Sequence, residues 1–177
     1  TSMYGGKDPV AAAQSTQDKH AAEKVVEIPR EVALAETIRK AEEAADQAAR
    51  AGKLSEAISL YASVLAKAPR SQPVARIREK ALKVALSMNP PPPVSEEAKR
   101  HLVRAEAFVK LAKDQEGLRH AVEELEEALG LAPWWDRAYY NLGLIQEKTG
   151  DPQAAAQSLK RYLLAAPYAA NAAAVKK

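Results

Sequence analysis

The sequence predicts an all-α protein built from antiparallel pairs of helices, and three observations lead to this prediction. Alanine is the commonest of the 177 residues and glycine occurs only 7 times, a composition that suits closely packed helices. Apolar residues recur at spacings of three and four, and no segment sustains the alternation with period two that is typical of a strand. Because short turns join consecutive predicted helices, neighbouring helices must pack antiparallel.

The composition also excludes several classes of function. The chain has no cysteine, which excludes disulfides, thiolate metal sites and cysteine nucleophiles. No apolar run approaches the ~20 residues that a membrane-spanning helix needs, so the chain is not expected to span a membrane. The formal net charge of +3 is too small to indicate a polyanion, and therefore a nucleic acid, as the partner.

The N-terminal third contains an arm followed by a helix. Residues 1–30 are expected to form an extended arm, with a short helix over 18–27. Pro29 suits the first turn of a helix, because it lacks an N–H and has a fixed φ. A helix is predicted over 31–51, and Gly52 is expected to end it with a left-handed backbone.

Two more helices are predicted before a proline-rich break. They span 54–67 and 72–88, and each carries its apolar residues on one face. The second has Arg76, Lys80 and Lys83 on the opposite face, which either is solvated or contacts phosphate or anionic lipid. The four prolines from Pro90 to Pro93 cannot continue a helix, so residues 90–94 are predicted to form a stiff linker after a first unit over 31–89.

The part after the prolines is predicted to be helical almost throughout. Helices are expected over 95–113, 117–131, 134–149 and 152–165, and residues 168–177 are expected to begin a C-terminal capping helix. Ser95 is a good N-cap for the first of these helices, and the two glutamates that follow suit its positive first turn.

A repeat of fixed length organises these helices. Pro133 and Pro167 are 34 residues apart, the period of a repeated helix–turn–helix unit. Segment 136–167 resembles the tetratricopeptide repeat (TPR) family through its signature residues Tyr139, Leu142, Gly143, Gly150, Ala155, Leu159, Tyr162 and Pro167. Gly143 and Ala155 occupy the positions where two helices approach most closely and small side chains are required. Segments 102–133 and 38–69 match the same pattern less completely.

The spacing of the first repeat departs from this pattern. Pro69 and Pro133 are 64 residues apart, which is less than two full repeats. The helix predicted over 72–88 is therefore interpreted as an extra capping helix that closes the first repeat, and residues 95–167 as two tandem repeats. The expected fold is an all-α, TPR-like superhelix of antiparallel helix pairs with this capping helix and a proline-rich break.

The resemblance implies a concave groove, lined by the first helix of each pair, that binds a protein or peptide segment. The family's groove positions correspond here to Arg39, Glu42, Asp46, Arg50, Val103, Glu106, Lys110, Asp114, Arg137, Tyr140, Asn141, Leu144 and Lys148. Tyr139, by contrast, is expected in the core. Trp134 and Trp135 have two interpretations: they fill the seam between two repeats, or they contact a partner.

Chemistry is not expected from this chain. The three histidines, His20, His101 and His120, are scattered without ligand spacing, and no phosphate-binding, dinucleotide-binding or nucleophile motif occurs. We therefore predict no catalytic residue, no cofactor and no metal, and a non-enzymatic interaction module or adaptor. Two alternatives are a self-associating scaffold, and so a homo-oligomer, and a regulatory domain of a larger protein. The alanine-rich repeats resemble bacterial examples, which favours the periplasm or envelope over the cytoplasm.

Overall fold

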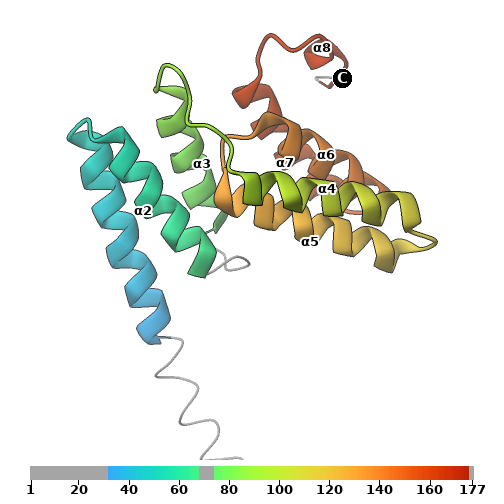
Figure 1. The fold of residues 1–177 in the computed structure, drawn as a ribbon, viewed down its shortest axis with the longest axis horizontal. Coiled ribbons are helices and arrows are strands. Elements are labelled where there is room, and N and C mark those ends of the chain that lie inside the picture. The colour runs from blue at the N-terminus through green and yellow to red at the C-terminus, as the bar shows by residue number, and fades with distance from the viewer. Residues whose placement is uncertain (1–31, 68–73, 176–177) are drawn as a thin grey trace, which may run out of the picture. The chain divides into compact units, whose positions relative to one another are not determined.

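All regular structure in the described part of the chain is helical, which confirms the all-α fold class (Figure 1). The structure is a computed structural model that describes residues 32–67 and 74–175. It divides into two compact units, 1–40 and 41–177. In the first unit residues 32–40 are helical, and the Arg39 guanidinium pairs with the Glu36 carboxylate at 2.7 Å. The predictions for the arm over 1–30, for Pro69 and for the start of a helix at residue 72 concern residues that the structure does not describe.

The second unit carries the helix pairs. Residues 41–50 are helical, and Gly52 follows with the predicted left-handed backbone, at φ 74°. The remaining helices are α2 (Leu54–Lys67), α3 (Val74–Leu86), α4 (Glu96–Leu111), α5 (Gln115–Leu131), α6 (Asp136–Lys148), α7 (Pro152–Ala165) and α8 (Ala172–Val175). Helices α2 and α7 have the predicted bounds, and within the described residues 168–175 of the C-terminal fragment the helix is α8.

The turn between α4 and α5 differs from the prediction. Helix α4 ends at Leu111 because Ala112 takes an extended backbone, with φ −61° and ψ 123°. The carboxylate of Asp114 then accepts a hydrogen bond from the backbone N–H of Gly117 at 3.0 Å, which makes Asp114 the N-cap of α5. Helix α5 therefore begins at Gln115, two residues before the predicted start, and Asp114 is a capping residue instead of a groove residue.

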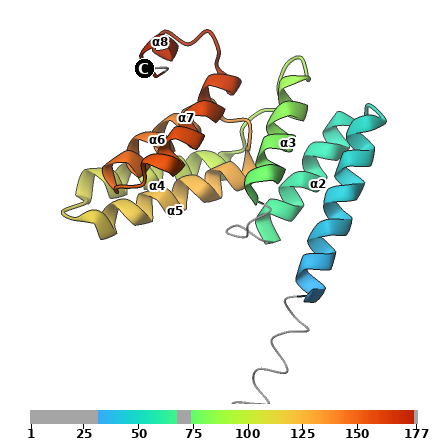
Figure 2. The same cartoon turned by 180° about the vertical axis from the view of Figure 1, so that it is seen from behind.

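Consecutive helices pack as pairs, α2 with α3, α4 with α5 and α6 with α7, and α5 joins the last two pairs (Figure 2). A hydrophobic core lies among α4, α5, α6 and α7 and also receives Leu82 from α3. Its members are Leu82, Leu102, Ala105, Ala121, Leu125, Leu129, Ala138, Tyr139, Leu142, Ile145 and Tyr162. The structure thus confirms the prediction that Tyr139 is a core residue; its hydroxyl donates to the carbonyl of Pro133 at 2.9 Å.

The segment Pro90–Pro93 connects helices that share this core. Leu82, which precedes the prolines, is fully buried against residues that follow them. The buried guanidinium of Arg78, also on α3, donates to the carbonyl of Glu126 on α5 at 3.1 Å. The indole N–H of Trp134 donates a hydrogen bond to the carbonyl of Pro92 at 2.8 Å, so the proline segment is attached to the residues that precede α6. The helices on its two sides are packed together in one unit.

Helices α6 and α7 approach each other closely at Gly143. A Cβ atom added to Gly143 would lie 2.7 Å from Cγ of Leu159 and 3.3 Å from the carbonyl oxygen of Ala155. Both distances are shorter than ordinary van der Waals contact. The expectation that a small residue is required at Gly143 is confirmed. In the preceding pair Val109 occupies the equivalent position of α4.

Candidate functional site

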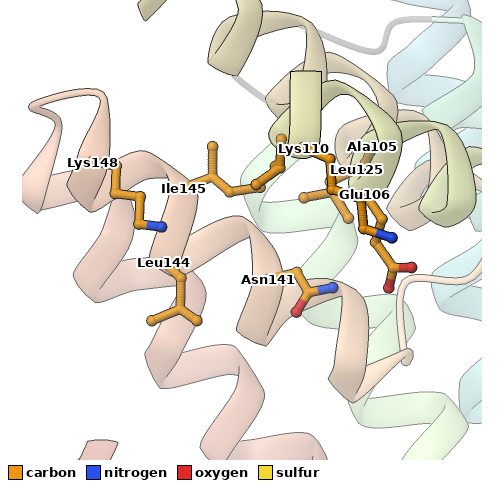
Figure 3. Close-up of a pocket in the computed structure, with 9 residues that line it drawn as sticks. Ala105, Glu106, Lys110, Leu125, Asn141, Leu144, Ile145 and Lys148 are labelled. Carbon is orange, nitrogen blue, oxygen red and sulfur yellow. The ribbon is translucent and has the colours of Figure 1, made fainter. Parts of the chain in front are cut away.

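A solvent-open groove lies between α4 and α6, the first helices of the last two pairs, and encloses about 280 Å³ (Figure 3). We call it the α4–α6 groove. It is lined by Ala105, Glu106, Val109 and Lys110 of α4, Leu125 of α5, and Asn141, Leu144, Ile145 and Lys148 of α6. Ala105, Leu125 and Ile145 are buried core residues and form its apolar lining.

Helical periodicity explains why these side chains meet. On α6, Asn141, Leu144 and Lys148 are spaced by three and four residues, so they lie along one face of the helix. Asn141 and Lys148 are two turns apart, about 10 Å along the axis. Figure 3 shows Asn141 and Lys148 at different ends of this row, with Leu144 between them. Leu144 is 37% exposed, which leaves part of its apolar side chain open to solvent at the groove.

The charged groups of the groove are unequally paired. The Arg137 guanidinium forms an ion pair with the Glu106 carboxylate at 2.6 Å, which links α6 to α4 at one end. Among the residues that the structure describes, Lys110 and Lys148 form no ion pair, and the amide of Asn141 makes no side-chain hydrogen bond. Since the only carboxylate in the lining already has a cation, the groove combines an apolar lining with two available ammonium groups.

The structure therefore brings together a subset of the predicted groove residues. Glu106, Lys110, Asn141, Leu144 and Lys148 line one hollow, and Arg137 is attached to it through Glu106. Val103, on α4, is exposed outside this lining.

Tyr140 is located elsewhere. Its ring packs on the ring of Tyr162, with centroids 5.1 Å apart, and is partly buried against the core. Because Tyr162 comes from α7, Tyr140 contacts its own helix pair, and it is not among the residues that line the groove.

Two of the predicted groove residues of the first repeat, Glu42 and Asp46, are bound by side chains of α3. Glu42 is only 5% exposed, and its carboxylate accepts hydrogen bonds from Arg76 at 2.6 Å and Lys80 at 2.7 Å. Asp46, one turn later, accepts from Lys80 at 2.6 Å and from the Tyr61 hydroxyl. These side chains hold α3 against residues 41–50, so Glu42 and Asp46 are not available to an external ligand. Arg50 is exposed.

The electrostatics of this cluster follow from its geometry. Burial by itself raises the pKa of Glu42, but the hydrogen bonds and charges of Lys80 and Arg76 outweigh it and hold the pKa below 4.5. The same balance lowers the pKa of Asp46, where Lys80 supplies the main favourable interaction. The sequence carries a signal for this cluster: the acidic residues Glu42 and Asp46 are four apart on one helix, and the basic residues Arg76 and Lys80 are four apart on another.

The two tryptophans lie at the junction of the last two pairs. Both rings are partly buried and pack against the core, and Trp134 is also bonded to Pro92. This placement supports the interpretation in which they fill the seam between repeats.

His101 belongs to a polar cluster on the surface of the α4/α5 pair. Nδ1 of His101 lies 2.7 Å from the Glu124 carboxylate, which also accepts from Arg104 at 2.8 Å, and this surface cluster ties α4 to α5. Within residues 32–67 and 74–175, no group of three histidine or carboxylate side chains is placed to hold a metal ion. In the same ranges, every helix is too short or too polar to cross a membrane.

Comparisons with known proteins identify no family. No protein-family model matches the chain, and no curated protein matches it. A crystal structure of MamA is similar over 70% of this chain and 74% of the MamA chain, with 19% sequence identity and a TM-score of 0.37. A likeness this distant carries no functional assignment, which has to come from the site itself.

Proposed function

We propose that this chain is a non-catalytic protein-interaction module that binds a peptide segment of another protein in the α4–α6 groove. The observation that carries the proposal is the open apolar lining of the groove flanked by two lysines without partners. A concave, mostly apolar hollow with a few convergent polar groups is the usual form of a binding site.

The apolar lining supplies affinity. Ala105, Leu125 and Ile145 are already buried by the fold, and Leu144 and Val109 add apolar surface at the rim. One leucine-sized side chain that fills this hollow would gain about 1.5–3 kcal/mol from burial. The ligand therefore needs at least one large apolar residue that points into the groove.

The polar groups supply orientation. Lys110 and Lys148 project from opposite walls, so acidic residues on either side of the apolar one would each meet an ammonium group. The Asn141 amide both donates and accepts, and so can bind a peptide backbone. The expected ligand is a short segment with an apolar residue flanked by Asp or Glu.

A selection from a random peptide library tests this proposal. The wild-type chain is the bait, and binding of the enriched peptides is compared with that of Leu144→Glu, which changes a partly exposed residue of the groove and should not disturb folding. Leu164→Glu is the matched control, because Leu164 is 45% exposed on α7 and outside this groove. We expect acidic–apolar peptides that bind wild type and Leu164→Glu and lose affinity for Leu144→Glu. Equal binding to all three proteins, or no enrichment, would refute the proposal.

The bacterial periplasm or envelope is the location that we propose for this activity. It is supported only by the resemblance of the alanine-rich repeats to bacterial TPR proteins. Fractionation of the native cells, followed by detection of the chain with an antibody, tests it directly; recovery in the cytoplasm alone would reject it.

A further inference from the structure

A second hollow, separate from the α4–α6 groove, lies between α3 and α7 and encloses about 270 Å³. We call it the α3–α7 hollow. Helix α7 supplies most of its lining from one face, because residues spaced by three and four lie along the same side of a helix. These residues are Gln157, Lys160, Arg161 and Leu164, and α3 contributes Glu79.

The positive charges of this hollow are only partly balanced. Within the described residues, neither Lys160 nor Arg161 forms an ion pair. The carboxylate of Glu79 is already bound to the ammonium group of Lys83 at 2.9 Å. No acidic residue follows Asp151 in the sequence, so α7 has no carboxylate of its own with which to neutralise the two cations. The lining therefore holds two unpaired cations beside a carboxylate that a third cation engages.

A buried cation adds to this positive charge. Arg78, which precedes Glu79 on α3, is 9% exposed, and its guanidinium donates to the carbonyl of Glu126. Its Nε has no hydrogen-bond partner among the described residues, although buried polar atoms are nearly always satisfied. Burial is the main cause that lowers the pKa of Arg78, and the positive charge of Arg161 lowers it further. An anion bound at Arg161 would relieve this repulsion between the two guanidinium groups.

Two acidic residues of α5 also act on Arg78. The charges of Glu126 and Glu127 raise the pKa of Arg78, but they do not outweigh burial, and the pKa stays lowered. Neither glutamate lines the α3–α7 hollow. They therefore offset part of the charge of Arg78 and leave Lys160 and Arg161 without a partner.

We propose that the α3–α7 hollow binds the phosphate group of a soluble ligand. The Arg161 guanidinium can donate two parallel N–H bonds to phosphate oxygens, and Lys160 adds a compact point charge beside it. The amide of Gln157 supplies a further donor. A membrane surface fits less well, because these cations share a hollow with a carboxylate instead of forming an even basic face. The site lies outside the α4–α6 groove and does not depend on the function proposed for that groove.

Titration of the isotope-labelled full chain with inorganic phosphate, followed by NMR, tests the proposal. Sodium chloride keeps the ionic strength constant, and sodium acetate is titrated separately as a carboxylate for comparison. Arg161→Gln and Lys160→Gln are the decisive variants, and the exposure of Lys160 means that its replacement should not disturb folding. Arg119→Gln is the matched control, because Arg119 is exposed on α5 and the change removes the same charge outside the hollow.

We expect phosphate to cause saturable shifts at Gln157, Lys160 and Arg161, and acetate to bind more weakly. Each decisive variant should weaken phosphate binding by about threefold to tenfold, because it removes one charged donor from an open site. Arg119→Gln should leave the affinity unchanged. Glu79→Gln should tighten binding, because it removes the negative charge that opposes the ligand.

Several results would overturn the proposal. These are shifts that do not saturate, unchanged affinity in both Arg161→Gln and Lys160→Gln, an equal loss in Arg119→Gln, and acetate binding as tight as that of phosphate. Co-sedimentation with vesicles that contain phosphatidic acid tests the other source of a phosphate group. Vesicle binding that depends on Arg161, without saturable binding of inorganic phosphate, would assign the hollow to a membrane surface and also overturn the proposal.

Discussion

Replacing Gly143 with alanine tests the packing of the last helix pair most directly. The added Cβ would lie 2.7 Å from Cγ and 2.8 Å from Cδ2 of Leu159, where carbon atoms normally approach to about 3.5–4.0 Å. It would also lie 3.3 Å from the carbonyl oxygen of Ala155, which belongs to the backbone of α7. A rotation of the leucine side chain relieves the first two overlaps, whereas the third requires the two helices to separate.

The net effect is a balance of two terms. Overpacking of this kind costs about 1–3 kcal/mol, and alanine regains up to about 1 kcal/mol because glycine is a poor helix former. We therefore expect Gly143→Ala to lower the free energy of unfolding by up to about 2 kcal/mol. The additional change Leu159→Ala should remove the overlap, so the double variant should lose less stability than the sum of the two single losses.

Urea denaturation monitored by circular dichroism measures these differences. Gly130→Ala is the matched control: Gly130 is also in a helix, but a Cβ added there meets no atom within 4 Å. This control should gain about 0.5–1 kcal/mol from helix propensity alone. If Gly143→Ala were as stable as Gly130→Ala, the close approach of α6 and α7 at Gly143 could not be correct.

Two further predictions concern contacts that join distant segments. Lys80→Met should lower the free energy of unfolding at pH 7 by about 1–3 kcal/mol, because it leaves the buried Glu42 with a single cation. The pKa of Glu42 is lowered in the folded state, so the ionised carboxylate stabilises the fold above pH 4.5, and this stabilisation is lost as the pH falls through the pKa of the folded state. In acid titrations between about pH 5 and 2, the variant should therefore lose less stability than wild type. Parallel curves for the two proteins would contradict this expectation. Trp134→Phe should cost about 1 kcal/mol in urea denaturation, because the carbonyl of Pro92 loses its donor. Trp135→Phe is its control, and equal losses in the two variants would show that the hydrogen bond is unimportant.

The sequence predicted the helices well wherever a local signal marked their ends. Helix α7 starts where Pro152 suits a first turn and Asp151 caps it, and α2 follows Gly52. The start of α5 was predicted two residues too late, and Asp114, which was expected in the groove, is its N-cap. An aspartate before a helix serves as an N-cap or as a groove residue, and only the backbone geometry distinguishes these roles.

The candidate site was predictable only in part, and the reason is the range of the contacts. The resemblance to the TPR family implied that Asn141, Leu144 and Lys148 of α6 belong to the groove, and that resemblance rests on local spacings and on the 34-residue period. The fate of Glu42 depends on Lys80, which is 38 residues away and belongs to a helix that the repeat pattern does not include. Repeat alignment assigns a residue to a face of its helix, but it does not show which other helix covers that face.

The shared core on the two sides of Pro90–Pro93 limits how far the last two repeats can be treated as a portable module. Leu82 fills space among residues of α4 to α7, and Arg78 reaches the backbone of α5. A chain that began at Ser95 would expose the surface that Leu82 covers. Grafting these repeats into another protein would therefore require α3 to be carried along with them, even though the sequence period places it outside every repeat.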